Sequence, residues 1–145
     1  MAIVVNGSNK GNFIANNKQL QKVYANGVLV WENWKPWSNS NSTYKDNYPS
    51  SPIYATISAG SNVVVKYIKA TAEKAFYDGE YGVVHIEAYY DGAWHELAHS
   101  DGSMSYCECS WSGKLVCEQI RANFGFQVYR WAKCSIEASG LMKGN

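Results

Sequence analysis

Apolar and polar residues alternate along most of the chain after residue 53. Between residues 81 and 90, Val84, Ile86, Ala88 and Tyr90 fall on one face of an extended strand and the polar residues fall on the other. This two-residue period is that of a half-buried β-strand. Leu115–Phe124 and Val128–Ala138 show the same alternation, and further strands are expected over Val63–Thr71, which is rich in β-branched residues, over Ala93–His99 and over Met104–Trp111. Short strands separated by glycine-containing turns predict an all-β chain with a β-sandwich of jelly-roll type.

One of these segments leaves a second interpretation open. Val116, Ile120 and Phe124 are spaced four residues apart, which is also the spacing of one face of a helix. We therefore expect a strand over Leu115–Phe124, with a short helix as the alternative.

A β-hairpin is predicted over Lys22–Glu32. Asn26-Gly27 lies between two apolar runs, and this pair is preferred in a type I′ turn because both central residues must adopt positive φ. A two-residue loop predicts four cross-strand pairs: Ala25 with Val28, Tyr24 with Leu29, Val23 with Val30, and Lys22 with Trp31. Both faces of the hairpin would then be apolar, one of them through Tyr24, Leu29 and Trp31. Since a lone hairpin is marginal in water, we expect it to dock on each side against the rest of this chain, a second subunit, or both.

Composition changes between the hairpin and the predicted sandwich. Residues 33–52 are dense in Asn, Ser and Pro, and they lack any periodicity. We expect a linker here because such a segment buries little apolar surface. Trp34 and Trp37 are expected to hold the linker against a neighbour and to extend the assembly interface of the hairpin. The predicted organisation is a docking hairpin over 1–32, a linker over 33–52 and a β-sandwich over 53–145.

Charge and size narrow the functional classes. The 145 residues (16.2 kDa) carry 13 basic and 12 acidic side chains, a formal net charge of +1. The sequence shows no basic patch for nucleic acid and no apolar segment of membrane-spanning length. We therefore expect neither nucleic acid nor a membrane as a partner. The first residues lack the basic start and the long apolar stretch of an export signal, so we expect a soluble protein made in the cytoplasm.

No recognised catalytic pattern occurs in the sequence. A nucleophile elbow, a phosphate-binding loop and a His-Glu-x-x-His motif are all missing, so we expect no enzyme activity and no cofactor. His95 and His99 lie four apart on a predicted strand, where we expect two solvated side chains that share an edge instead of a metal pair. Four cysteines without metal-knuckle spacing are expected to be reduced thiols in the core: Cys107, Cys109, Cys117 and Cys134. We therefore expect no metal.

The last predicted strand offers a candidate ligand-binding surface. If it buries Ala132 and Cys134, its other face presents an aromatic strip flanked by cations, formed by Tyr129, Arg130, Trp131 and Lys133. Aromatic side chains beside cations stack on sugar rings or anchor protein interfaces. The alternative is a central strand covered on both faces, in which case the strip belongs to the core or to a subunit contact.

The segment KVYANGVLVWE, residues 22–32, resembles an element near the start of many phage and prophage tail, baseplate and fibre proteins. The preceding residues 2–8 (AIVVNGS) resemble the way such proteins begin. The resemblance implies a virion structural protein, made in the bacterial host cytoplasm, with other virion proteins as partners and a homo-oligomeric state. The expected role is to dock through the hairpin and display the sandwich, with a host-surface glycan as a possible ligand of the displayed part. A free carbohydrate-binding module and a capsid-decorating protein are the alternatives.

The second part of the chain resembles the galactose-binding-like β-sandwich. The segments that carry this resemblance are VVHIEAYYDGAWHEL (residues 83–97) and FQVYRWAKCSIEASGLM (residues 126–142). In such domains the first pattern is mostly structural, which implies that Ile86, Tyr90 (or Tyr89), Trp94 and Leu97 fill the core. The resemblance implies a fold and leaves the ligand open.

Overall fold

The computed structural model describes residues 14–15, 18–19, 22–75, 81–126 and 130–144. These residues form twelve β-strands and contain no helix, so the prediction of an all-β chain is confirmed. The short-helix alternative is wrong, because Gln119–Gly125 form strand β11. Within these residues, nothing has the helical length and apolarity needed to cross a bilayer.

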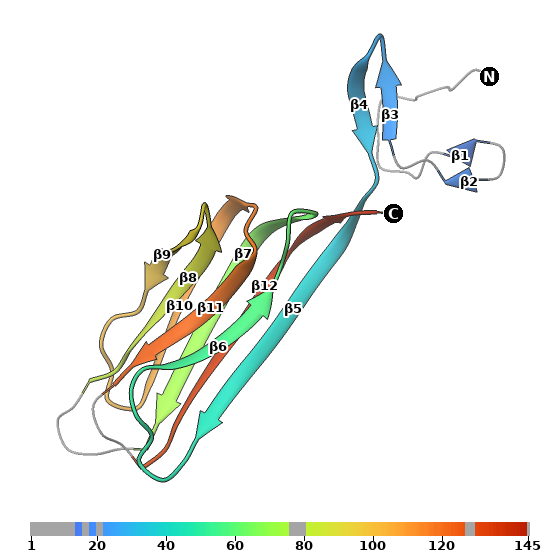
Figure 1. The fold of residues 1–145 in the computed structure, drawn as a ribbon. Coiled ribbons are helices and arrows are strands. Elements are labelled where there is room, and N and C mark those ends of the chain that lie inside the picture. The colour runs from blue at the N-terminus through green and yellow to red at the C-terminus, as the bar shows by residue number, and fades with distance from the viewer. Residues whose placement is uncertain (1–13, 16–17, 20–21, 76–80, 127–129, 145) are drawn as a thin grey trace. The chain divides into compact units, whose positions relative to one another are not determined.

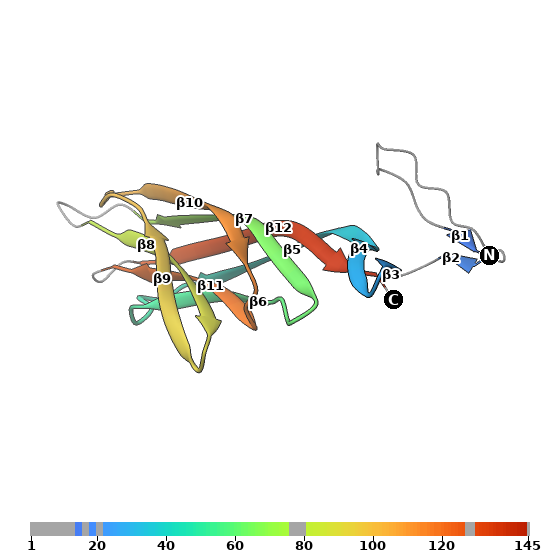
Figure 2. The ribbon, with the colours of Figure 1, turned by 90° about the horizontal axis from the view of Figure 1, so that it is seen from above.

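Eight strands form a sandwich of two four-stranded sheets (Figures 1 and 2). One sheet has the order β10 (Tyr106–Leu115), β7 (Val63–Lys74), β12 (Ala132–Lys143) and β5 (Trp34–Lys45). The other has the order β6 (Ile53–Ser58), β11, β8 (Val83–Tyr90) and β9 (Ala93–His99). Each strand of the first half pairs with one of the second half in reverse order: β5 with β12, β6 with β11, β7 with β10 and β8 with β9. This nested pairing is the jelly-roll topology that the strand pattern predicted.

The inward positions of both sheets form one apolar core. Its largest fully buried side chains include Phe124, Ile68, Ile86 and Ile120, each at most 1% exposed. The buried apolar residues that the structure describes all come from residues 53–138. Facing sheets bury such a layer because their inward side chains interdigitate across a gap of about 10 Å.

The cysteines fill this core as predicted. Cys107, Cys117 and Cys134 are buried, Cys109 packs against the core at its edge, and all four thiols are free. Burial disfavours the thiolate, which raises the pKa of Cys134 to about 12 and the pKa values of Cys109 and Cys117 to about 11. These cysteines therefore behave as small apolar side chains near neutral pH.

The prediction of a linker over residues 33–52 is wrong for residues 34–45, which form the twelve-residue strand β5. What looked like a patternless Asn/Ser run has a two-residue period. Asn39, Asn41 and Thr43 alternate with serines, and their side chains donate hydrogen bonds to backbone carbonyls of β6. The donor–acceptor distances are 3.3 Å from Asn39 to Ser58, 2.9 Å from Asn41 to Thr56 and 2.6 Å from Thr43 to Tyr54.

This polar ladder joins the edge strands of the two sheets. The Nδ2 atoms of Asn39 and Asn41 donate to β6, and their Oδ1 atoms accept hydrogen bonds from the backbone N–H groups of Ser40 and Ser42, each at 2.9 Å. Open strand edges pair readily with other chains, so side chains that occupy these backbone groups protect the edge. Strand β5 thus closes one side of the sandwich with polar side chains, and closing this edge requires no apolar residue.

The chain forms two compact units, residues 36–142 and residues 1–35 with 143–145. The smaller unit contains the short strands β1 (Ile14–Ala15) and β2 (Lys18–Gln19) and the hairpin of β3 (Lys22–Ala25) and β4 (Val28–Glu32). Asn26 and Gly27 have φ values of 50° and 75°, as the predicted type I′ turn requires.

The register of the hairpin is correct only next to the turn. Ala25 pairs with Val28 and Tyr24 with Leu29, as predicted, but a register shift then pairs Val23 with Trp31 and Lys22 with Glu32. The predicted pairs of Val23 with Val30 and of Lys22 with Trp31 are therefore wrong. A shift of one residue also changes the alternation along the strand. Counting in steps of two therefore no longer predicts that Trp31 shares a face with Tyr24 and Leu29. The side chains of these three residues lie outside the described part, so the docking interface stays a prediction.

Removing the polar ladder should weaken the sandwich. We expect the double variant Asn39→Ala/Asn41→Ala to lose about 1–2 kcal/mol of unfolding free energy, since each exposed hydrogen bond contributes modestly. It should also self-associate more than the unchanged chain, because the backbone edge of β6 becomes free. Urea denaturation and size-exclusion chromatography measure the two effects. The matched control is Ser40→Ala/Ser42→Ala, which keeps the ladder; equal behaviour of the two variants would disprove its role.

Candidate functional site

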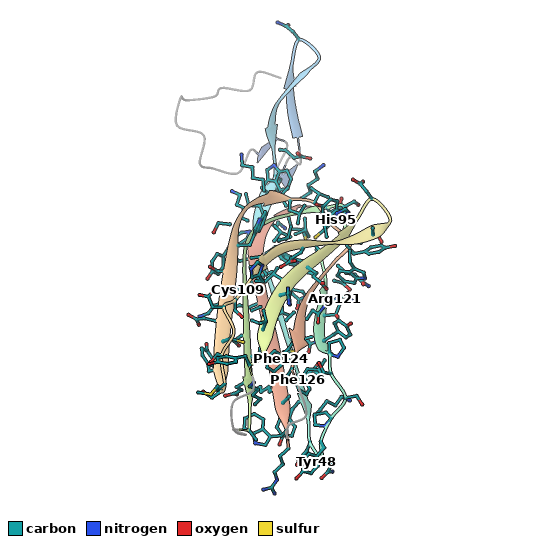
Figure 3. All side chains as sticks on the ribbon, turned by 90° about the vertical axis from the view of Figure 1, so that its left-hand side faces the viewer. Tyr48, His95, Cys109, Arg121, Phe124 and Phe126 are labelled. Atoms are coloured by element: carbon teal, nitrogen blue, oxygen red, sulfur yellow. The ribbon has the colours of Figure 1, made fainter. Side chains whose placement is uncertain are left out.

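The outer face of the β6–β11–β8–β9 sheet gathers most of the charged and aromatic contacts of the sandwich. Strand alternation turns Ile120, Ala122 and Phe124 of β11 into the core and leaves Arg121 and Asn123 on the outer face. Arg121 lies opposite Thr56 of β6 on one side and Glu87 of β8 on the other. Arg121 is labelled in Figure 3.

Arg121 is the centre of this face. Its guanidinium carbon lies 4.3 Å from the ring centroid of Tyr54 on the neighbouring strand β6 and 4.0 Å from that of Trp94 on β9, the strand beyond β8, so the cation lies over two aromatic rings. Its Nε atom donates to Glu87 Oε2 at 2.6 Å. The two charged side chains are only 20% and 17% exposed, so their ion pair is partly shielded from water.

Glu87 and Trp94 are fully engaged by their neighbours. The second carboxylate oxygen of Glu87 accepts a hydrogen bond from Asn123 Nδ2 at 3.2 Å. The ring of Tyr89 lies 5.3 Å from that of Trp94 at an interplanar angle of 60°. Trp94 thus belongs to the outer face, whereas the galactose-binding resemblance implied a core position. Ile86, Tyr90 and Leu97 do lie in or against the core as implied.

A cluster of two histidines and a glutamate lies on the same face. His85 of β8 and His99 of β9 are direct cross-strand partners. Their Nδ1 atoms lie 3.0 Å and 2.8 Å from Glu96 Oε1, within hydrogen-bonding distance. These interactions hold the pKa of Glu96 below its usual value, the hydrogen bond from His85 being the largest cause.

A β-bulge creates this cluster. Ile86 pairs with Ala98, but Glu87 pairs with Glu96, so Leu97 is the extra residue in β9. The bulge changes the parity of the strand and brings Glu96 and His99, three residues apart, to the same face.

His95 and His99 both lie on the edge strand β9, as predicted, but the bulge turns their side chains to opposite faces of the sheet. The bulge separates them, because His95 lies on the other side of the extra residue. The ring of His95 stacks on Tyr90 with centroids 4.0 Å apart, and its Nε2 atom lies 3.1 Å from the Tyr90 carbonyl oxygen.

The outer face of the other sheet carries two adjoining shallow grooves of about 480 Å³ and 570 Å³. Both include Ser40 and Glu137, so they follow β5, β12 and β7 as one surface. Their lining is mostly Ser, Thr and Asn, with Lys69 in the first groove and Tyr67 in the second. The side chain of Tyr67 is 39% exposed. The second groove therefore offers an accessible aromatic ring beside hydrogen-bonding groups.

The structure describes three of the four residues of the predicted ligand strip, which itself stays a prediction. Tyr129 lies outside the described residues. Arg130 is exposed, and the half-buried Trp131 stacks on Tyr44 with centroids 5.9 Å apart. Lys133 lies opposite Glu73 in the sheet. Ala132 and Cys134 are buried, as the strip required.

The predicted assembly tryptophans fall in different units. Trp34 belongs to the N-terminal unit, where Lys143 Nζ lies 5.7 Å from its ring centroid. Trp37 belongs to the sandwich and packs against its core. Sequence reasoning assigned Trp37 to an assembly interface, whereas in the structure it packs inside its own unit.

Sequence reasoning did not identify Arg121, Glu87, Glu96 and His85 as members of a site. The one sequence feature that pointed to them was strand alternation, which placed His85 and Glu87 on the outward side. Their partners come from strands 11 to 36 residues away, so only the pairing of strands reveals them.

Comparisons with known proteins assign no family. No protein-family model matches the chain, and no curated protein matches it. Among solved structures, the Yersinia pseudotuberculosis-derived mitogen has a TM-score of 0.46 at 6% identity, covering 77% of this chain and 98% of the mitogen. Structures of infectious bursal disease virus match with TM-scores of 0.45 (Gx strain, 8% identity) and 0.43 (Gt strain, 7% identity). The viral matches cover 88% of this chain but only 40% and 42% of the viral chains.

Breaking the partly buried ion pair should destabilise the sandwich. We expect Arg121→Met to lower the unfolding free energy by about 2–3 kcal/mol, because Glu87 keeps its charge and loses its cation. The double variant Arg121→Met/Glu87→Gln should recover at least about 1 kcal/mol relative to the sum of the single variants. Chemical denaturation of all four proteins gives the coupling energy. Additive losses would mean that the pair contributes no coupling.

Proposed function

We propose that this chain is a structural component of a phage or prophage virion that docks through its N-terminal unit and displays the jelly-roll sandwich. The observation that carries the proposal is the division into two compact units, one of which contains the hairpin. The buried apolar residues that the structure describes in the sandwich come from residues 53–138. The resemblance of residues 22–32 to phage tail, baseplate and fibre proteins supports the virion context.

The proposed docking interaction is apolar burial of the hairpin. Burying Tyr24, Leu29 and Trp31 against neighbouring subunits contributes about 5–8 kcal/mol before ordering costs, at ~25 cal/mol per Å² of apolar surface. Repetition around a symmetric particle multiplies such a contact, because each further contact of a linked assembly forms at a high effective concentration. The same apolar docking interaction would serve whether the protein attaches to the tail or to the capsid surface.

The displayed part suits a structural role. Jelly rolls build many viral capsid and lectin domains, although a fold alone does not fix a function. In this chain the sandwich closes its β5–β6 edge with side-chain hydrogen bonds, so that edge is not offered to neighbours as a pairing strand. Assembly through a separate element is consistent with that protection.

Carbohydrate binding is the second candidate function, and the polar groove beside Tyr67 favours it. Sugar sites combine hydrogen-bonding side chains with an aromatic ring, and the groove that contains Tyr67 also offers Ser and Asn side chains and Glu137. Titration with host cell-wall polysaccharide distinguishes the two candidates. Saturable binding that is lost in Tyr67→Ala would favour a carbohydrate-binding module, whereas a purely structural component should bind none.

A charge in the hairpin should block assembly without unfolding the sandwich. We expect Trp31→Glu to abolish incorporation into particles, because a buried carboxylate without a partner opposes docking. The far-ultraviolet circular dichroism and melting temperature of the sandwich should stay unchanged. Incorporation is measured by quantifying the protein in purified particles. Tyr106→Glu, on an exposed position of β10, is the matched control and should assemble normally; normal incorporation of Trp31→Glu would contradict the docking role.

A further inference from the structure

The His85–Glu96–His99 cluster has the donor set of a transition-metal site. Two imidazole nitrogens and one carboxylate oxygen, one from each residue, all lie within 4.8 Å of one another. Imidazole together with carboxylate suits Zn²⁺ and its neighbours in the first transition row, whereas Ca²⁺ and Mg²⁺ prefer oxygen ligands.

The distances lie close to those that a bound ion needs. Metal–ligand bonds of 2.0–2.2 Å in a tetrahedron place the ligand atoms about 3.3 Å apart. Glu96 Oε1 is 3.0 Å from His85 Nδ1 and 2.8 Å from His99 Nδ1. Small side-chain rotations therefore convert the hydrogen-bonded arrangement into a coordinating one, with the ion replacing the ring protons.

The backbone fixes the position of the three ligands. His85 and His99 are paired across β8 and β9, with ring centroids 5.9 Å apart. The bulge at Leu97 then places Glu96 on their face, where a regular strand would turn it away. Bulges re-aim side chains at functional sites, and this bulge assembles three metal-ligand types that the sequence separates.

The surroundings leave the site open to an ion. The side chains of His85, Glu96 and His99 are 34%, 46% and 64% exposed, so water can reach the cluster and complete the coordination. The neighbouring carboxylate, Glu87, is held by Arg121 and Asn123 and does not compete for the same ion.

We propose that His85, Glu96 and His99 form a surface site for a divalent transition-metal ion, Zn²⁺ being the best match, with water in the remaining position. The ion would fasten β9, which lies at the end of its sheet, to β8. This site is independent of the proposed virion role, because all three ligands belong to the sandwich.

Isothermal titration of the full, tag-free chain with ZnCl₂ in a non-coordinating buffer tests the proposal. We expect one ion per chain. His85→Ala and His99→Ala should each weaken binding by about 100-fold or more, since even changes behind the ligands of a metal site cost 10–100-fold. The matched control is His95→Ala, which removes a histidine from the same strand outside the cluster and should leave the affinity unchanged. Absence of saturable binding, or equal losses in all three variants, would overturn the proposal.

Nuclear magnetic resonance of the unchanged protein gives a second measurement that requires no variant. Zn²⁺ should shift the imidazole resonances of His85 and His99 and leave those of His95 in place. Binding that persists in the double variant His85→Ala/His99→Ala but disappears after thiol alkylation would assign the ion to cysteines and overturn the proposal. Unshifted His85 and His99 resonances at saturating Zn²⁺ would also do so.

Discussion

Two facing sheets share one apolar layer only if the inward positions of their strands are apolar. In this chain the inward row is built largely from Ala, Val, Ile and Cys, with Phe124 as the largest fully buried side chain. The remaining features depend on that layer. It fixes which side of each strand faces outward, and so it sets the positions of Arg121, Glu87 and His85. It also makes the cysteines unreactive apolar residues, because their thiolates would be desolvated.

The outer face acquires its chemistry where the regular pattern is interrupted or where strands meet. Arg121 gains its two aromatic neighbours from β6 and β9, on either side of the β11–β8 pair. Glu96 joins two histidines because one extra residue in β9 reverses the alternation. On the opposite side, the Asn ladder of β5 occupies the edge of β6. This ladder leaves that edge unavailable as a pairing strand, which is consistent with the proposal that docking uses the N-terminal unit.

Much of the fold follows from local pattern. The period of two predicted the strands of the sandwich and the jelly-roll class, and Asn26-Gly27 predicted the turn of the hairpin. The first strand of the jelly roll was missed because Asn39, Asn41 and Thr43 are polar on the side that faces β6, and apolar periodicity cannot detect a polar contact. Bulges were missed for a related reason: the extra residue at Leu97 depends on how β8 and β9 pair. That pairing also decides that His99 meets His85 and Glu96 while His95 stacks on Tyr90, so the cluster could not be read from spacing.

The central claim is that a self-contained sandwich is carried into an assembly by a separate docking unit. Hydrogen–deuterium exchange of the full chain, free and in the assembled particle, tests this claim most directly. The account predicts the same strong protection of β7, β8, β11 and β12 in both states, with new protection concentrated in residues 22–32 of the particle-bound chain. New protection spread over the sandwich strands, with none in residues 22–32, would contradict it.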